Sequence, residues 1–224
     1  GIYSFQLSKT ITAGEGGAVV TDDPLLFERA SRFHDLGMLR PPHQAAVGKP
    51  GMTSFVGTNY RMNEMTGAVM CAQLRKLETI LGRLRRNARF VKERVQGLPG
   101  IRLRNSPDPD GETGAHVYLL LASRELRDQF VAALRAENLP ASPPSGSLVL
   151  PPVPYIENKV TPHAEWPSFR SPHGKAIRYG TECCPRTTEI YQRAAALHMG
   201  PRYTDGDLAD IVTGVEKVSR ALLG

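Results

Sequence analysis

The stretch Ser4-Phe5-Gln6-Leu7-Ser8-Lys9-Thr10-Ile11-Thr12-Ala13-Gly14-Glu15-Gly16-Gly17 places one lysine shortly before a glycine-rich turn. An apolar run, Ala18-Val19-Val20-Thr21, follows it and is typical of a short buried strand. Glycines let the backbone turn sharply and approach a ligand closely. A lysine becomes a covalent catalyst when a carbonyl group can reach its amine. The lysine precedes the glycines, so the stretch is not a phosphate-binding loop of the GxxxxGK[ST] type.

The same stretch resembles the cofactor-lysine segment of the DegT/DnrJ/EryC1/StrS aminotransferases, pyridoxal-phosphate enzymes that mostly aminate keto-sugars. The family pattern is a Ser-Phe pair, then a lysine, then a Gly-Glu-Gly-Gly turn, which Ser4, Phe5, Lys9 and residues 14–17 match. The resemblance implies that Lys9 binds pyridoxal 5'-phosphate covalently. It also implies that Ser4 donates a hydrogen bond to the cofactor phosphate.

A second stretch, Asn59-x-Arg61-Met62-x-Glu64, matches the family at the expected place after the lysine. The resemblance implies that Asn59 reaches the cofactor phosphate of the other subunit, in a homodimer with a shared active site. A neutral amide suits this role because it supplies two donors without adding charge. Capping of a helix is the structural alternative for Asn59. Arg61 is expected to pair either with a phosphate or with Glu64.

His34 stands beside Asp35 near the end of a predicted helix. The two residues suit either an acid–base pair or a histidine that closes a helix beside a surface carboxylate. Members of the family often carry a His-Gly element here, which favours a substrate contact for His34.

A proline-rich segment, residues 140–172, cannot form a continuous helix or a central strand. We interpret it as an ordered irregular loop. Its side chains that suit a sugar, by stacking or by contact with hydroxyl groups, are His163, Trp166, Arg170 and His173. Simple packing explains the same residues equally well.

The order of elements indicates an α/β protein. A helix is predicted to start at residues 21–24 and to end near residues 34–37, with Leu25, Leu26, Phe27, Ala30 and Phe33 as its apolar face, and residues 38–55 are expected to form a loop. A stripe of apolar residues then predicts one long amphipathic helix: Leu74, Leu77, Leu81, Leu84, Ala88, Val91 and Val95. A buried strand over 116–122, a helix capped by Ser123 and a final helix with a capping box at Thr204 follow.

By resemblance, the fold is the pyridoxal-phosphate-dependent transferase fold type I, represented by the end of its large domain and its small C-terminal α/β domain. Residues 1–60 are then a remnant of the large, cofactor-binding domain. Residues 61–97 are the long connecting helix, and residues 98–224 are the small domain.

The bulk composition is ordinary for a globular protein, with 41% hydrophobic and 22% charged residues. A net charge of +6 raises the question of nucleic acid, although a solvated basic helix explains it equally well. Three cysteines without CxxC spacing favour a reducing, cytoplasmic setting and give no zinc motif. The sequence contains no apolar run of membrane-spanning length.

The resemblance implies a pyridoxal-phosphate-dependent aminotransferase that moves an amino group from glutamate or glutamine to a nucleotide-linked keto-sugar or a keto-cyclitol. Family members place several cofactor contacts before the lysine, and only eight residues precede Lys9 here. We therefore expect a truncated chain that is inactive alone. The alternative is a non-catalytic regulatory or DNA-binding module of the same family, with the basic helix as its contact surface.

Overall fold

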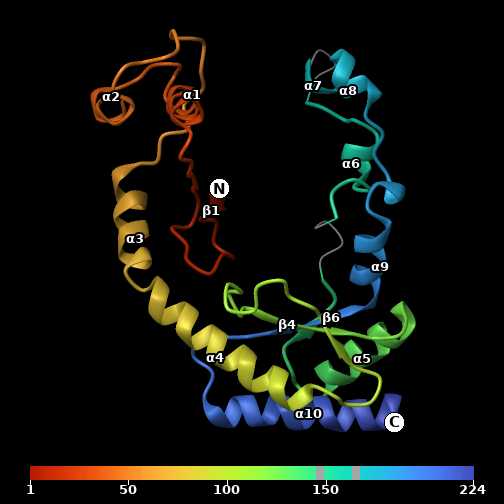
Figure 1. Ribbon diagram of the computed structural model, residues 1–224. Coiled ribbons are helices and arrows are strands. Elements are labelled where there is room, and N and C mark those ends of the chain that lie inside the picture. The colour runs from red at the N-terminus through yellow and green to blue at the C-terminus, as the bar shows by residue number, and fades with distance from the viewer. Residues whose placement is uncertain (145–148, 163–166) are drawn as a thin grey trace. The chain divides into compact units, whose positions relative to one another are not determined.

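The computed structural model describes residues 1–144, 149–162 and 167–224 (Figure 1). The chain divides into two compact units, Gly1–Ile80 and Leu81–Gly224. His163 and Trp166, two of the residues predicted to face a sugar, lie outside the described residues. The predicted assignment of residues 1–60, 61–97 and 98–224 to parts of a larger enzyme stays a prediction.

The first unit is built on a two-stranded antiparallel sheet of β1 (Ile2–Ser4) and β2 (Gly17–Val19), in which Ile2 pairs with Val19. Three helices follow: α1 (Pro24–His34), α2 (Pro41–Val47) and α3 (Glu64–Leu74). The side chain of Asp23 caps α1, because it accepts hydrogen bonds from the first two free backbone N–H groups of that helix.

Helix α2 lies inside the segment that was expected to be a loop. The expectation was wrong because Pro41 and Pro42 occupy the first two positions of the helix, where a missing N–H and a fixed φ favour a helix. Gly48 follows α2 with a φ of 71°, and its N–H donates to the Gln44 carbonyl to close the last turn.

The stripe that predicted one long helix is divided between α3 and α4 (Leu77–Val95). Arg75 and Lys76 form a turn between the two helices. The Arg75 N–H donates to the Cys71 carbonyl, and the Lys76 N–H donates to the Gln73 carbonyl. The stripe is buried only in its later part, at Leu84, Ala88, Val91 and Val95. The apolar repeat continues across the turn between α3 and α4. The repeat alone therefore does not indicate where one helix ends and the next begins.

The second unit is organised around a four-stranded sheet in the order β3-β4-β6-β5. Its strands are β3 (Arg102–Leu103), β4 (His116–Leu120), β5 (Ala141–Ser142) and β6 (Ala194–His198), and every neighbouring pair is antiparallel. Helices α5 (Arg124–Ala136) and α10 (Asp205–Leu223) lie on one side of it (Figure 1). The shorter elements are α6 (Pro154–Glu157), α7 (Pro167–Arg170), α8 (Pro172–Ala176), the 3-10 turn η2 (Thr181–Cys183) and α9 (Pro185–Arg193).

The hydrophobic core of the second unit fills the space between the sheet and helices α5 and α10. Fully buried side chains come from β4, α5, β6 and α10, among them Leu119, Phe130, Leu197 and Val215. Two caps predicted from the sequence are confirmed. Ser123 caps α5, and Thr204 with Asp207 forms a capping box at the start of α10.

The structure also shows the length and composition of the helices and the state of the cysteines. Among the described residues, no helix combines the length and the apolar composition needed to cross a bilayer. All three cysteines are free thiols.

Candidate active site

Lys9 lies in the loop that joins β1 to β2. Two backbone hydrogen bonds hold the base of this loop: Phe5 N–H donates to Gly16 C=O at 2.9 Å, and Ala13 N–H donates to Phe5 C=O at 3.0 Å. The Thr12 hydroxyl donates to the same Phe5 carbonyl at 2.9 Å. The side chain of Lys9 is exposed, and its amine has no hydrogen bond or ion pair with any residue that the structure describes. The loop is therefore fixed at its base, while the lysine amine stays free.

The glycine turn after Lys9 is required by the conformation of its backbone. Gly16 has a φ of +133°, where a side chain would be strained, and a Cβ there would lie 2.8 Å from the methyl carbon of Met62. The tip of the Met62 side chain would have to move to admit it. The same contact brings the second family motif, which contains Met62, against the lysine loop.

Asn59 and Arg61 stand in an extended segment just before α3. The Arg61 N–H donates to Asn59 Oδ1 at 3.2 Å, which leaves the Asn59 amide nitrogen without a partner among the residues described. Asn63, not Asn59, caps α3, since its Oδ1 accepts from Thr66 N–H at 2.8 Å. The capping alternative for Asn59 was therefore wrong.

Asp35 is the residue that anchors Arg61. The Arg61 guanidinium bonds Asp35 Oδ1, and the Nε atom of Arg40 donates to Asp35 Oδ2 at 2.6 Å. Asp35 is buried, and burial alone would raise the pKa of its carboxyl group. The hydrogen bonds from Arg61 and Arg40 outweigh burial and hold that pKa below its ordinary value. Pairing of Arg61 with Glu64 is not what the structure shows.

The segment that carries Asn59 is also tied to the end of α1 by its backbone. Thr58 N–H donates to Phe33 C=O at 3.1 Å, and Tyr60 N–H donates to His34 C=O at 2.8 Å. Gly37 makes this approach possible: its φ is +81°, and a Cβ there would overlap the Phe55 carbonyl. The orientation of Asn59 and Arg61 is therefore set by the C-terminal end of α1.

A buried ion pair on α1 holds the chain just ahead of this segment. Arg32 Nε donates to Glu28 Oε1 at 2.8 Å, and Glu28 also accepts from the backbone N–H groups of Gly51 at 2.7 Å and Met52 at 3.2 Å. Arg32 in turn donates to the Met52 carbonyl at 2.9 Å. Burial would raise the pKa of Glu28, but the bonds from Gly51, Arg32 and Met52 lower it overall. The face of α1 that is buried is thus charged.

This arrangement corrects the predicted apolar face of α1. Leu25, Leu26 and Phe33 are all at least half exposed, whereas Glu28, Ser31 and Arg32 are buried. Sequence periodicity did not predict that Glu28 and Arg32 are buried, because it does not detect their backbone partners, which lie 20 and more residues away.

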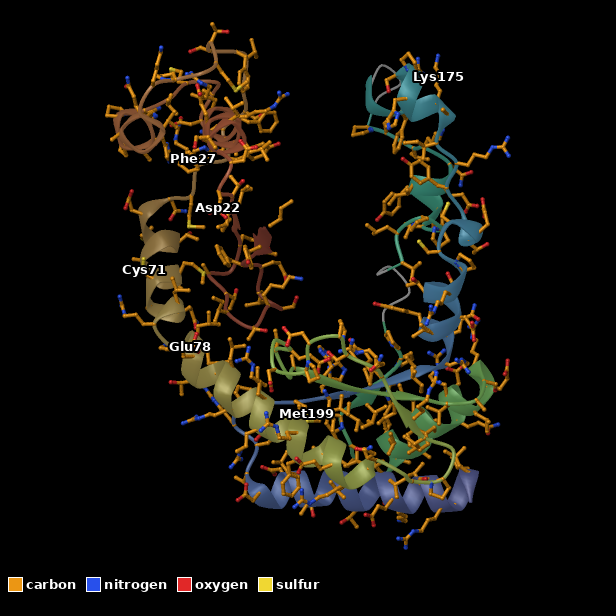
Figure 2. All side chains as sticks on the ribbon, in the orientation of Figure 1. Asp22, Phe27, Cys71, Glu78, Lys175 and Met199 are labelled. Carbon is orange, nitrogen blue, oxygen red and sulfur yellow. The ribbon has the colours of Figure 1, made fainter. Side chains whose placement is uncertain are left out.

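His34 does not form the acid–base pair with Asp35. Its Nδ1 atom donates to the Ser31 carbonyl at 2.6 Å, and its ring meets His43 edge to face with centroids 5.3 Å apart. Both histidines line a cavity of about 610 Å³ in the first unit, together with aromatic side chains. Figure 2 labels Phe27, which contacts the His43 ring with centroids 6.3 Å apart. His43 Nδ1 is buried without a hydrogen-bond partner among the described residues.

The residues that the sequence singled out are therefore only partly brought together. Ser4 ends β1, and its exposed hydroxyl accepts a weak bond from Gln6 N–H at 3.4 Å. Lys9, Ser4 and Asn59 present an amine, a hydroxyl and an amide nitrogen that are all free to donate. This donor set fits an aldehyde that also carries a phosphate, because the amine can bond the carbonyl and the other two groups can bond phosphate oxygens.

Comparison with known proteins gives the chain a family. A model of the DegT/DnrJ/EryC1/StrS aminotransferase family matches residues 1–216. The chain is 28% identical over 226 residues to L-glutamine:2-deoxy-scyllo-inosose aminotransferase of Micromonospora echinospora, covering 97% of the chain and 52% of that protein. It is 27% identical to GDP-perosamine synthase of Escherichia coli O157:H7, covering 84% of the chain and 51% of that protein. The chain thus spans about half the length of the curated relatives it matches.

Solved structures agree on the fold. The aminotransferase from Psychrobacter cryohalolentis has a TM-score of 0.71 at 19% identity, covering 100% of this chain and 56% of that one. DesV of S. venezuelae has a TM-score of 0.69 at 24% identity, covering 97% of this chain and 51% of that one. The expected α/β aminotransferase fold is confirmed.

Proposed function

The chain belongs to the DegT/DnrJ/EryC1/StrS aminotransferase family, and from this premise we propose that it carries the lysine of a pyridoxal-phosphate-dependent sugar aminotransferase. The donor is glutamate or glutamine, and the acceptor is a nucleotide-linked keto-sugar or a keto-cyclitol. Relatives whose names specify glutamine and an inosose, or a GDP-sugar, support these two acceptor classes. The observation that carries the proposal is the free amine of Lys9 on a loop whose base is fixed by hydrogen bonds.

The site residues have distinct roles in this proposal. Lys9 would hold pyridoxal phosphate through the cofactor carbonyl, and the Ser4 hydroxyl would donate to its phosphate. When bound, the cofactor would supply an electron sink for the substrate. The Lys9 amine would act as the general base, moving a proton at Nζ between the substrate carbon and the cofactor carbon. The exposed position of Lys9 leaves room for both tasks.

Asn59 and Arg61 complete the binding surface. The Asn59 amide nitrogen donates to the cofactor phosphate across the interface of a homodimer with a shared active site. Asp35, which Arg40 also bonds, holds the Arg61 guanidinium, whose remaining donors are directed to an anionic group of the substrate. His34 is the substrate contact on the side of the aromatic cavity. His163 and Trp166 stay candidates for sugar contacts.

We propose further that the 224 residues do not transaminate by themselves. The curated relatives are roughly twice as long as the portion that matches, so half of each relative has no counterpart in these residues. In this assignment, residues 1–60 belong to the large domain, residues 61–97 connect the domains, and residues 98–224 form the small domain. The setting we propose is cytoplasmic.

Binding of nucleic acid has less support than the enzyme reading. Several basic side chains on α4 already contact acidic groups. Lys92 bonds Glu112, Arg89 lies 3.5 Å from Asp110, and Arg86 lies 3.2 Å from Asp205. A basic helix that is neutralised in this way offers less charge to a phosphate backbone. We therefore keep nucleic acid outside the proposed partners.

Borohydride reduction of the protein isolated from its source, followed by intact mass measurement and peptide mapping, tests the proposal. A reduced pyridoxal adduct on Lys9 is the expected result, because reduction makes the lysine–cofactor bond permanent. In a recombinant full-length protein, Lys9→Arg should abolish the adduct. Lys49→Arg serves as the matched control, since Lys49 is an exposed lysine in a loop of the same unit. An adduct on another lysine, or no adduct at all, would overturn the assignment.

A further inference from the structure

Two histidines from distant parts of the chain face each other across the sheet of the second unit. His116 in β4 lies directly opposite His198 in β6. The Met199 N–H donates to the Ala115 carbonyl at 2.9 Å, one residue outside the pair on each strand. This pattern marks His116 and His198 as a non-hydrogen-bonded pair, the arrangement in which opposite side chains approach most closely.

The pair lies at the solvent-exposed end of its face of the sheet. Both histidines are exposed, whereas the next residues inward along the strands, Val117 and Leu197, point to the other face and are fully buried. Helix α5 contacts β5 and β6, and β4 and β6 run side by side (Figure 1). The strands that carry the histidines are therefore held by the core, and their imidazoles remain accessible.

The separation of the rings suits chelation of one ion. Their centroids are 4.8 Å apart, and their planes are inclined at 67°. Two imidazole nitrogens bound to one zinc-like ion at about 2.0–2.1 Å, at angles between square and tetrahedral, place ring centres roughly 4.5–5.2 Å apart. The observed distance falls within this interval, so chelation requires rotation of the rings and little movement of the backbone.

A third side chain fixes the orientation of one histidine. Ser142 in β5 lies on the same face, with its Oγ 2.8 Å from His198 Nε2. If Nε2 carries the proton and donates to Ser142, Nδ1 of His198 is left as a free ligand. A partner that holds the second nitrogen is the arrangement that metal-binding histidines usually show.

We propose that His116 and His198 chelate one divalent transition-metal ion of the zinc, nickel and copper class, with Ser142 orienting His198. The described residues contain no group of three or more histidine, cysteine or acidic side chains suited to a metal. The two histidines are therefore the protein's only ligands from that part of the chain, and water or the oxygen atoms of a bound anion complete the coordination. This open coordination distinguishes the site from a closed structural zinc site.

The test uses the full 224-residue chain without a histidine tag, titrated with Ni²⁺ and with Zn²⁺ in a calorimeter. The three thiols are blocked first, because the free cysteines are also zinc ligands. One ion per chain is expected. His116→Gln and His198→Gln should each weaken binding at least about tenfold, and Ser142→Ala should weaken it less.

His173→Gln is the matched control, because His173 is an exposed histidine on α8, away from the sheet, and its removal should leave the affinity unchanged. As a second measurement that does not depend on variants, paramagnetic Ni²⁺ should broaden the ring signals of His116 and His198 first. Equal binding by the wild type and His116→Gln, or broadening elsewhere before these two rings, would overturn the proposal.

Discussion

The two units differ in what they bury. Among residues 1–80, all of which the structure describes, Met70 is the sole buried hydrophobic side chain, while Glu28, Ser31, Arg32 and Asp35 are buried polar or charged groups. The second unit buries an apolar core that runs through its sheet, α5 and α10. Large exposed apolar side chains show the reverse distribution. Of those described, all belong to the first unit except Leu150, Tyr155, Val160 and Leu222.

This contrast indicates where the stability of the chain resides. Burial of apolar surface is the main favourable contribution to folding, and a two-stranded sheet is marginal without a surface to pack on. The second unit has that surface in its own residues. The first unit relies on a few hydrogen-bonded charges, and these same charges orient the candidate site. The part that carries the proposed chemistry is thus the part with less intrinsic stability.

A matched pair of phenylalanine variants gives the largest expected effect. Phe130 in α5 is 0% exposed, whereas Phe33 in α1 is 50% exposed. Phe130→Ala should cost about 3–5 kcal/mol of unfolding free energy, because it removes a fully buried ring and leaves a cavity. Phe33→Ala should cost less than about 1 kcal/mol. Urea unfolding followed by circular dichroism measures both, and equal costs would refute the contrast between the units.

The buried ion pair of α1 gives an effect of intermediate size that is local to the first unit. Glu28→Gln removes the charge that binds Arg32 and accepts from two backbone N–H groups. Amide hydrogen exchange at Gly51 and Met52 should therefore accelerate, while exchange in β4 and β6 should not change.

Glu78→Gln is the control for that experiment. Glu78 is exposed in the first turn of α4 and is labelled in Figure 2. It should leave exchange at Gly51 and Met52 as in the wild type. If Glu28→Gln also leaves the exchange rates of Gly51 and Met52 unchanged, the ion pair does not hold residues 51–54.

The sequence predicted those features whose causes are local. The strand after the glycine turn follows from the apolar run at residues 18–21, although β2 is largely exposed and not buried as predicted. The starts of α5 and α10 follow from Ser123 and Thr204. A hydroxyl side chain at the start of a helix acts on N–H groups two or three residues away, so a short window contains all the information. The second motif was likewise recognised from a few adjacent residues.

The features that the sequence did not predict depend on partners far along the chain. Arg61 was expected to pair within its own motif or with a phosphate, but it bonds Asp35, 26 residues earlier. His116 and His198 are brought together only by the antiparallel pairing of β4 with β6. Periodicity marks which side chains are apolar, but it does not indicate which charged side chains will find a buried partner. Periodicity therefore could not predict the charged interior of the first unit.

Acid titration of Asp35 should give the smallest effect, and it tests whether the charged interior supports the first unit. The pKa of Asp35 is lowered from its ordinary value of 3.8, so the unfolded chain takes up this proton before the folded chain does. Its contribution to stability is then complete above pH 3.8 and is lost as the pH falls through the lower pKa of the folded state. Carbon-13 NMR of the Asp35 carboxyl group should show a midpoint below 3.8, and the Asp35→Asn variant should lose this part of the pH dependence of unfolding. Asp22→Asn, at the exposed carboxylate labelled in Figure 2, is the matched control and should retain it. A midpoint of Asp35 at or above 3.8 would mean that Arg40 and Arg61 do not outweigh burial, and the orientation of Arg61 would then need another cause.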